Sequence, residues 1–277
     1  MPPQVKLASP LYIIREQCAQ DLFGALRKLK EIGYDGVEFL GFFGHGADAV
    51  RRELDALGLR ALGNHVPYRQ AVEQSVETLA FHAAVGCRYL SLGDWPQTGF
   101  PGGADWGRTL DGLTRLSEQA RAYGITLLYH NHDNELIARV DGRELLDVLL
   151  SAAPAEVLSF EPDLGWIEIG GGDCVEYLTR YAERCPVIHL KDYYSTDRSK
   201  HGFVRDFIPR RGGAERGFFE FRPTGYGVLN LPRLMPLCLA CAPEWFVMDH
   251  DLAYERDSFA DLKLSLDYVK ALLALQG

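Results

Sequence analysis

Strand-like and helix-like stretches alternate eight times along the chain, and this regularity restricts the possible folds more than any other feature of the sequence. Short apolar runs are each followed by an amphipathic stretch of helical period. The predicted strands span residues 5–8, 36–40, 59–65, 88–93, 125–130, 157–163, 186–192 and 245–251. The helical patterns lie near residues 18–32, 47–57, 69–85, 106–123, 142–152, 173–184, 229–241 and 255–275. Near-continuous apolar strands separated by helices predict a parallel sheet covered by helices.

The chain length favours a closed sheet. Barrels of eight β–α units commonly use about 250 residues as one domain, and this chain has 277 residues. Eight units in strict order therefore predict the α/β class and a single (β/α)8 TIM barrel, rather than an open doubly wound sheet. Because no change in composition marks a boundary, we expect residues 1–277 to form one barrel.

One segment, residues 193–227, departs from the alternating pattern. It is long, rich in glycine and without clear period, and it carries seven Lys or Arg against four Asp or Glu on a chain of net charge −9. Because it follows the seventh strand, we expect this loop insertion to lie over the C-terminal face of the barrel. Two roles are open: a lid that attracts an anionic substrate group through Arg205, Arg210 and Arg211, or a dimer contact.

Charge and composition exclude several classes of protein. A net charge of −9 disfavours nucleic-acid binding. The sequence shows neither the apolar run of a signal peptide nor the roughly 20 apolar residues of a membrane span, so we expect a cytoplasmic protein without a membrane partner. The six cysteines are too sparse for a disulfide scaffold. Cys238 and Cys241 form a C-x-x-C in an apolar helical stretch, which predicts buried structural thiols.

Polar side chains gather where the predicted strands end, which is where TIM-barrel active sites are built. They are Glu38, Asn64, His65, Asp94, Trp95, His130, Asn131, His132, Glu161, Asp163, His189, Lys191, Asp192, Asp249, His250 and Asp251. Any single one of them could instead cap the next helix. Together, imidazole and carboxylate groups suit one divalent ion, Mn²⁺, Co²⁺ or Zn²⁺, with Mg²⁺ or Fe²⁺ as alternatives, better than Ca²⁺.

The chain resembles the xylose isomerase-like TIM barrels (AP endonuclease family 2), a group of sugar phosphate isomerases and epimerases. The resemblance covers nearly the whole chain, and its motifs occur in the family's order. They are the segments 11–39, GLRALGNHVPY (58–68), YHNHDNE (129–135), FEPDLGWIEIGGGD (160–173), VIHLKD (187–192), GYGVLNLPRL (225–234) and VMDHD (247–251).

The resemblance implies four metal ligands, one from each of the last four strands: His130, Asp163, His189 and Asp249. Many members of the family carry glutamate at the first and last of these positions, and in epimerases the glutamate pair supplies two opposed acid/base groups. Histidine and aspartate here argue against that symmetric mechanism. Glu135, in the loop after the fifth strand, is a candidate for the missing carboxylate.

Strand periodicity adds candidates beside these ligands. Alternation along the fifth strand places His130 and His132 on one side, so His132 is a candidate acid/base or substrate contact. Lys191 shares a face with His189. It either binds a substrate oxygen and stabilises an enolate, or forms an ion pair with a carboxylate such as Glu161.

Four further residues are candidates for substrate binding. Glu38 and His65 are expected to bind substrate hydroxyls, with a packing role as the alternative. Trp95 and Trp166 are candidates for an apolar wall against a sugar face, or for core or rim packing.

The resemblance and these residues predict a metal-dependent sugar isomerase or epimerase that removes a proton next to a carbonyl and passes through an enediolate. Asp249, Glu135 or His132 would move the proton. The alternatives are a lyase of the inosose dehydratase or 3-keto-glycoside-eliminating kind, or a non-catalytic barrel that has lost its site. Phosphodiester cleavage is disfavoured by the acidic charge and by the presence of only eight histidines. We expect a small carbohydrate substrate and a homo-oligomer, dimer or tetramer.

Overall fold

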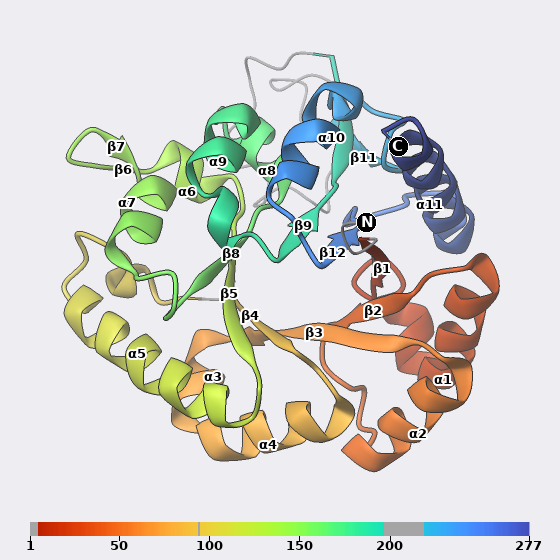
Figure 1. The fold of residues 1–277 in the computed structure, drawn as a ribbon, viewed down its shortest axis with the longest axis horizontal. Helices are drawn as coiled ribbons and strands as arrows, with labels where there is room; N and C mark the ends of the chain where they lie inside the picture. The colour runs from red at the N-terminus through yellow and green to blue at the C-terminus, as the bar shows by residue number, and fades with distance from the viewer. Residues whose placement is uncertain (1–4, 94, 197–218, 277) are drawn as a thin grey trace.

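The computed structural model describes residues 5–93, 95–196 and 219–276. Its main sheet has eight parallel strands: β1 (Lys6–Pro10), β2 (Gly36–Phe39), β3 (Arg60–Pro67), β4 (Tyr89–Gly93), β5 (Thr126–His130), β8 (Ser159–Glu161), β9 (Val187–His189) and β12 (Trp245–Val247). They pair in the order β8-β5-β4-β3-β2-β1-β12-β9. A parallel bridge between Asp163 and His189 joins the two edge strands, β8 and β9. The predicted TIM barrel is confirmed (Figure 1).

Helices surround the sheet as an outer ring (Figure 1). They are α1 (Arg15–Ile32), α2 (Ala47–Leu57), α3 (Tyr68–Glu73), α4 (Ser75–Val85), α5 (Trp106–Ala122), α6 (Asn134–Ile137), α7 (Leu145–Ala152), α8 (Leu164–Ile169), α9 (Cys174–Arg180), α10 (Leu231–Ala240) and α11 (Ser258–Ala274), with 3-10 turns at Gln97–Gly99 and Ala182–Arg184. The sequence predicted one helix at 69–85, but the non-helical Gln74 divides it in two.

The last three barrel strands are shorter than the sequence predicted. Strands expected to end at residues 163, 192 and 251 end at Glu161, His189 and Val247. The polar residues that follow therefore lie in loops, where Asp163 caps α8 by accepting a hydrogen bond from the Trp166 N–H at 2.9 Å. Two short helices that the sequence did not predict also begin in loops after strands: α6 after β5, and α8 after β8.

Most buried apolar side chains form one cluster between the strands and the helices, and a smaller cluster fills part of the barrel interior. All six cysteines are buried and free, as expected for structural thiols. None of the helices in the described ranges combines the length and the apolar character that a bilayer crossing requires.

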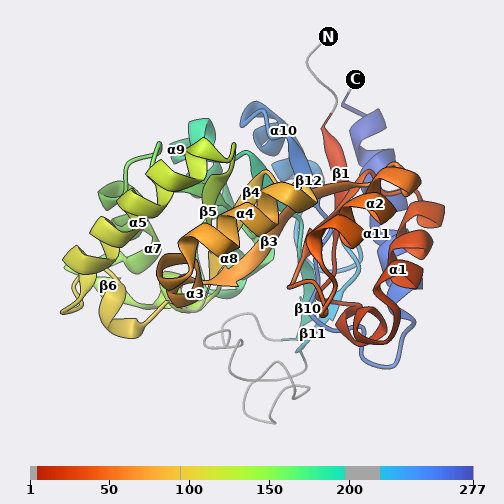
Figure 2. The same ribbon diagram turned by 90° about the horizontal axis from the view of Figure 1, so that it is seen from below.

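Two short hairpins stand outside the barrel sheet. One pairs β6 (Arg139–Val140) with β7 (Arg143–Glu144), and the other pairs β10 (Asp192–Ser195) with β11 (Phe219–Arg222). The second hairpin joins the two ends of the predicted insertion, a pairing that its irregular sequence did not reveal. Figure 2 shows it at the end of the barrel opposite the start of β1 and the end of α11.

Most of the predicted insertion, including Arg205, Arg210 and Arg211, lies outside the described residues, as does Asp94. The lid and dimer-contact roles therefore stay predictions. The far end of the insertion is fixed by Asp192, whose carboxylate accepts hydrogen bonds from the N–H groups of Gly225 and Gly227.

Gly63 lies where two strands of the barrel approach too closely for a side chain. It lies where the β2–β3 register shifts, and a Cβ at this position would lie 2.6 Å from the carbonyl oxygen of Tyr89. Gly63→Ala should therefore lower the free energy of unfolding by about 1–3 kcal/mol, measured by urea denaturation. Gly107→Ala on α5, where a Cβ would meet nothing within 4 Å, should be neutral or stabilising. Equal effects of the two changes would contradict this account.

Candidate metal and substrate site

A cavity of about 280 Å³ opens at the C-terminal ends of the strands. Its lining includes seven residues that the sequence placed in the site: Glu38, His65, His130, His132, Trp166, His189 and Asp249. Asp251, which the sequence noted only as a strand-end residue, also lines it. All the acidic and imidazole side chains of this lining are strand-end residues of the sequence analysis.

The structure brings the four predicted ligands together. One ligand atom from each of His130, Asp163, His189 and Asp249 lies within 4.8 Å of the other three, and all four residues are buried. Asn131 faces away from His132 and holds the backbone of Asp163, accepting a hydrogen bond from its N–H at 3.0 Å. The group fits a divalent metal ion in residue type and spacing.

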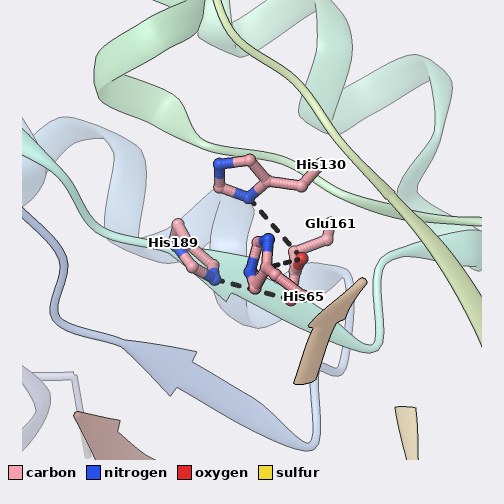
Figure 3. A group of neighbouring side chains, drawn as sticks. All are labelled: His65, His130, Glu161 and His189. Carbon is pink, nitrogen blue, oxygen red and sulfur yellow. Dashed lines mark ion pairs between the residues drawn. The ribbon is translucent and has the colours of Figure 1, made fainter. Parts of the chain in front are cut away.

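Glu161, which the sequence analysis noted only as a strand-end residue and a possible partner of Lys191, lies inside the site. Its carboxylate lies among three histidines, 3.4 Å from His189, 3.5 Å from His130 and 3.8 Å from His65 (Figure 3). The four residues form a second group with metal-ligand spacing. Its position two residues before Asp163 was a usable signal, because alternate residues of a strand share a face.

His130 and His189 each lie between Glu161 and an aspartate. One ring nitrogen of each faces Glu161, while His130 Nε2 lies 3.8 Å from Asp163 and His189 Nδ1 lies 3.1 Å from Asp249. Burial lowers the pKa of His130 to about 3, so its ring is neutral and offers a lone pair. Burial alone would lower the pKa of His189, but Glu38, Glu161 and Asp249 raise it well above its usual range.

Several buried polar atoms in this region have no hydrogen bond among the described residues. They are both carboxylate oxygens of Glu161, Oδ2 of Asp163 and Nδ1 of His130. Burial raises the pKa of Asp163 to about 7, with a smaller contribution from the neighbouring Asp249, because a buried charge is costly at this position. A cation at this point would offset that cost, so the residues present fit the metal ion that the donor set implies.

Lys191 is fully buried and does not line the cavity. Its ammonium lies 2.8 Å from Asp249 and 2.7 Å from Asp251. Of the two roles expected from the sequence, Lys191 therefore has that of an ion-pair partner, with Asp249 and Asp251 as its carboxylates in place of Glu161. Burial alone would raise the pKa of Asp249, but Lys191 and His189 hold it well below its usual range. Asp249 is therefore ionised but only weakly basic, which suits a metal ligand better than a proton acceptor.

Glu135 and Trp95 lie outside the main cavity. Both oxygens of Glu135 accept hydrogen bonds, from the Tyr129 hydroxyl at 2.7 Å and from the His132 backbone N–H at 3.0 Å. Glu135 belongs to neither group with metal-ligand spacing, so the structure does not place it as a replacement carboxylate. Trp95 lines an adjoining cavity, whereas Trp166 lines the main one beside His132.

The family model described as "Xylose isomerase-like TIM barrel" matches residues 26–237. Inosose dehydratases of Geobacillus kaustophilus and Bacillus licheniformis are each 25% identical, over 189 and 183 residues. The matches cover 60% and 58% of this chain and the same shares of those enzymes.

A solved structure has a similar fold. It is a sugar phosphate isomerase/epimerase from Parabacteroides distasonis, with a TM-score of 0.75 and 21% identity. The superposition covers 97% of this chain and 94% of that chain. This likeness shows the fold alone.

Glu161→Gln should weaken metal binding. Losing the carboxylate that faces both histidines removes the group that orients their rings, and such outer partners typically change metal affinity by about 10- to 100-fold. Calorimetric titration with Mn²⁺ or Zn²⁺ measures the change. The control is Glu176→Gln, a half-exposed glutamate on α9 paired with Arg180. Unaltered metal affinity in a folded Glu161→Gln protein would show that Glu161 does not support the ligands.

Lys191→Met should destabilise the protein. It would leave the buried carboxylates of Asp249 and Asp251 without their counter-charge, at a cost of about 3–5 kcal/mol in the free energy of unfolding. The control, Lys263→Met, removes an exposed pair with Asp267 and should cost about 1 kcal/mol or less. Urea denaturation of both variants without added metal measures the difference, and equal losses would refute the assigned role of Lys191.

Proposed function

We propose, since the chain belongs to the xylose isomerase-like TIM barrel family, that it is a divalent-metal-dependent enzyme that removes a proton next to a carbonyl of a sugar or sugar derivative. The observation that carries the proposal is the buried group His130, Asp163, His189 and Asp249 beside a cavity that His132 also lines. The cavity combines metal-ligand chemistry with a group whose ordinary pKa lies near neutrality.

The proposed roles follow from position. His130, Asp163, His189 and Asp249 would hold the ion, which, when bound, polarises a substrate carbonyl and so acidifies the neighbouring C–H. Glu38 and His65 lie 3.1 Å apart at the cavity surface and bind substrate hydroxyls. Trp166 provides an apolar wall for the carbon skeleton.

His132 is the proposed proton carrier. The other two candidates are less suitable, because Lys191 keeps Asp249 ionised and weakly basic, while Glu135 is occupied by Tyr129 and His132. In this proposal an imidazole nitrogen of His132 takes the proton from the carbon next to the carbonyl.

We propose that this proton removal leads to loss of a β-hydroxyl, as in a dehydratase: the C–O bond breaks, a C=C bond forms next to the carbonyl, and the oxygen leaves as water with the proton that His132 took. Elimination needs no second base on the opposite face of the substrate, and the symmetric glutamate pair of the epimerases is replaced by His130 and Asp249. The inosose dehydratases among the relatives support this outcome. Isomerisation or epimerisation is the second candidate; isomerisation needs only one base, because His132 could return the proton to the neighbouring carbon on the same face.

The first step is testable with an inosose and with simple ketoses in D₂O. NMR should show deuterium uptake next to the carbonyl, and His132→Gln should slow this exchange by about 100- to 10,000-fold with metal content retained. Asp163→Ala should lose both the metal and the exchange. Release of water or of a substituent would identify the lyase, and a new epimer or isomer would identify the second candidate. Exchange at the unmodified rate in His132→Gln would remove His132 from the mechanism.

A further inference from the structure

A second cavity of about 420 Å³ adjoins the main one. The two share Gly93, His130 and His132 in their linings, so the second opens directly beside the proposed proton carrier. The rest of its lining is mostly apolar, with Leu92, Phe100, Pro101, Val140 and Leu145 among its members. The sequence analysis predicted no second cavity. The lining of this cavity comes from β4, β5 and the segments that follow them, up to the first residue of α7.

Aromatic rings form one wall of the second cavity. Trp95 stacks on Phe100 with ring centroids 5.5 Å apart and an interplanar angle of 25°. The ring of Tyr129 meets Trp95 edge-on at 5.2 Å and 86°. Flat aromatic surfaces of this kind favour a planar ligand, which can stack on one ring and meet the edge of another.

The wall also carries an unsatisfied hydrogen-bond donor. Trp95 is 8% exposed, and its indole N–H has no acceptor among the described residues. A buried tryptophan N–H ordinarily finds a partner. The carboxylate of Glu135, which also lines the cavity, is already taken by Tyr129 and His132. The cavity therefore offers aromatic surface, and one of its lining residues carries a donor that has no acceptor among the described residues.

We infer that the second cavity binds a planar, largely apolar substituent of the sugar, carrying an oxygen acceptor at or near its attachment point. An aryl group linked through a glycosidic or phenolic oxygen meets these requirements. The inference rests on the proposed function, which places the sugar itself in the main cavity. The main cavity lies just below the range of about 300–1,000 Å³ that is typical of drug-sized ligands, so the added space extends the site to a larger substrate.

Calorimetric titration of the full-length protein with phenol, phenyl glucoside and methyl glucoside tests this inference. Trp95→Ala should weaken binding of phenol and phenyl glucoside by about tenfold. Trp95→Phe keeps a ring but removes the donor, and should weaken both by roughly two- to tenfold. The control is Trp245→Phe, at the start of β12 and outside both cavities, which should bind all three probes like the parent protein.

Ala138→Phe, which fills the second cavity from its rim, provides an independent variant if Trp95→Ala fails to fold. It should abolish the preference for phenyl glucoside over methyl glucoside. No such preference in the parent protein, or a preference unchanged in Trp95→Phe and Ala138→Phe, would overturn the inference.

Deuterium exchange on an unsubstituted inosose separates this inference from the proposed function. Deuterium exchange without a preference for phenyl glucoside over methyl glucoside would support the proposed reaction and reject the second cavity as a subsite. Aryl preference that disappears in Ala138→Phe, together with no exchange on any sugar, would support the subsite and reject the reaction.

Discussion

The barrel closes at the seam between β8 and β9, and the rest of the site depends on that closure. A bridge between Asp163 and His189 makes the seam, with the His189 N–H bonded to the Pro162 carbonyl at 2.9 Å. Asn131 adds a side-chain hydrogen bond to the Asp163 backbone. The same two residues that close the sheet belong to the proposed metal group. Backbone pairing therefore fixes the spacing of the ligands before any ion binds, which is a form of preorganisation.

Buried charge is the second constraint on this end of the barrel. Five carboxylates, Glu38, Glu161, Asp163, Asp249 and Asp251, lie buried around one lysine and a group of histidines. Lys191 lies closest to Asp249 and Asp251, whereas both oxygens of Glu161 and Oδ2 of Asp163 have no hydrogen bond among the described residues. Charges in such a setting are stable only when compensated. This excess of buried negative charge is the physical reason that the site could hold a cation.

Much of the fold and of the site was predictable from local pattern. The alternation of apolar runs and amphipathic stretches gave all eight barrel strands, and period-two spacing placed His130 beside His132. Pairings between elements were not predictable. Lys191 forms ion pairs with Asp249 and Asp251, some 60 residues further along the chain, because β9 lies next to β12 in the sheet. The sequence analysis noted Glu161 only as a strand-end residue and a possible partner of Lys191, because its contacts are with histidines on three other strands that converge on it only in the closed barrel.

The sequence by itself determined the (β/α)8 architecture and the end of the barrel at which polar residues collect. Both follow from short-range periodicity and from the rule that parallel strands point the same way. Tertiary structure decided which of those residues act together. In the folded protein Glu135 accepts a hydrogen bond from Tyr129, and Lys191 forms an ion pair with Asp249. Trp95 lines the second, aromatic cavity and not the main cavity proposed for the sugar. These outcomes depend on distances between strands that are remote in sequence, and such distances are set only when the sheet closes.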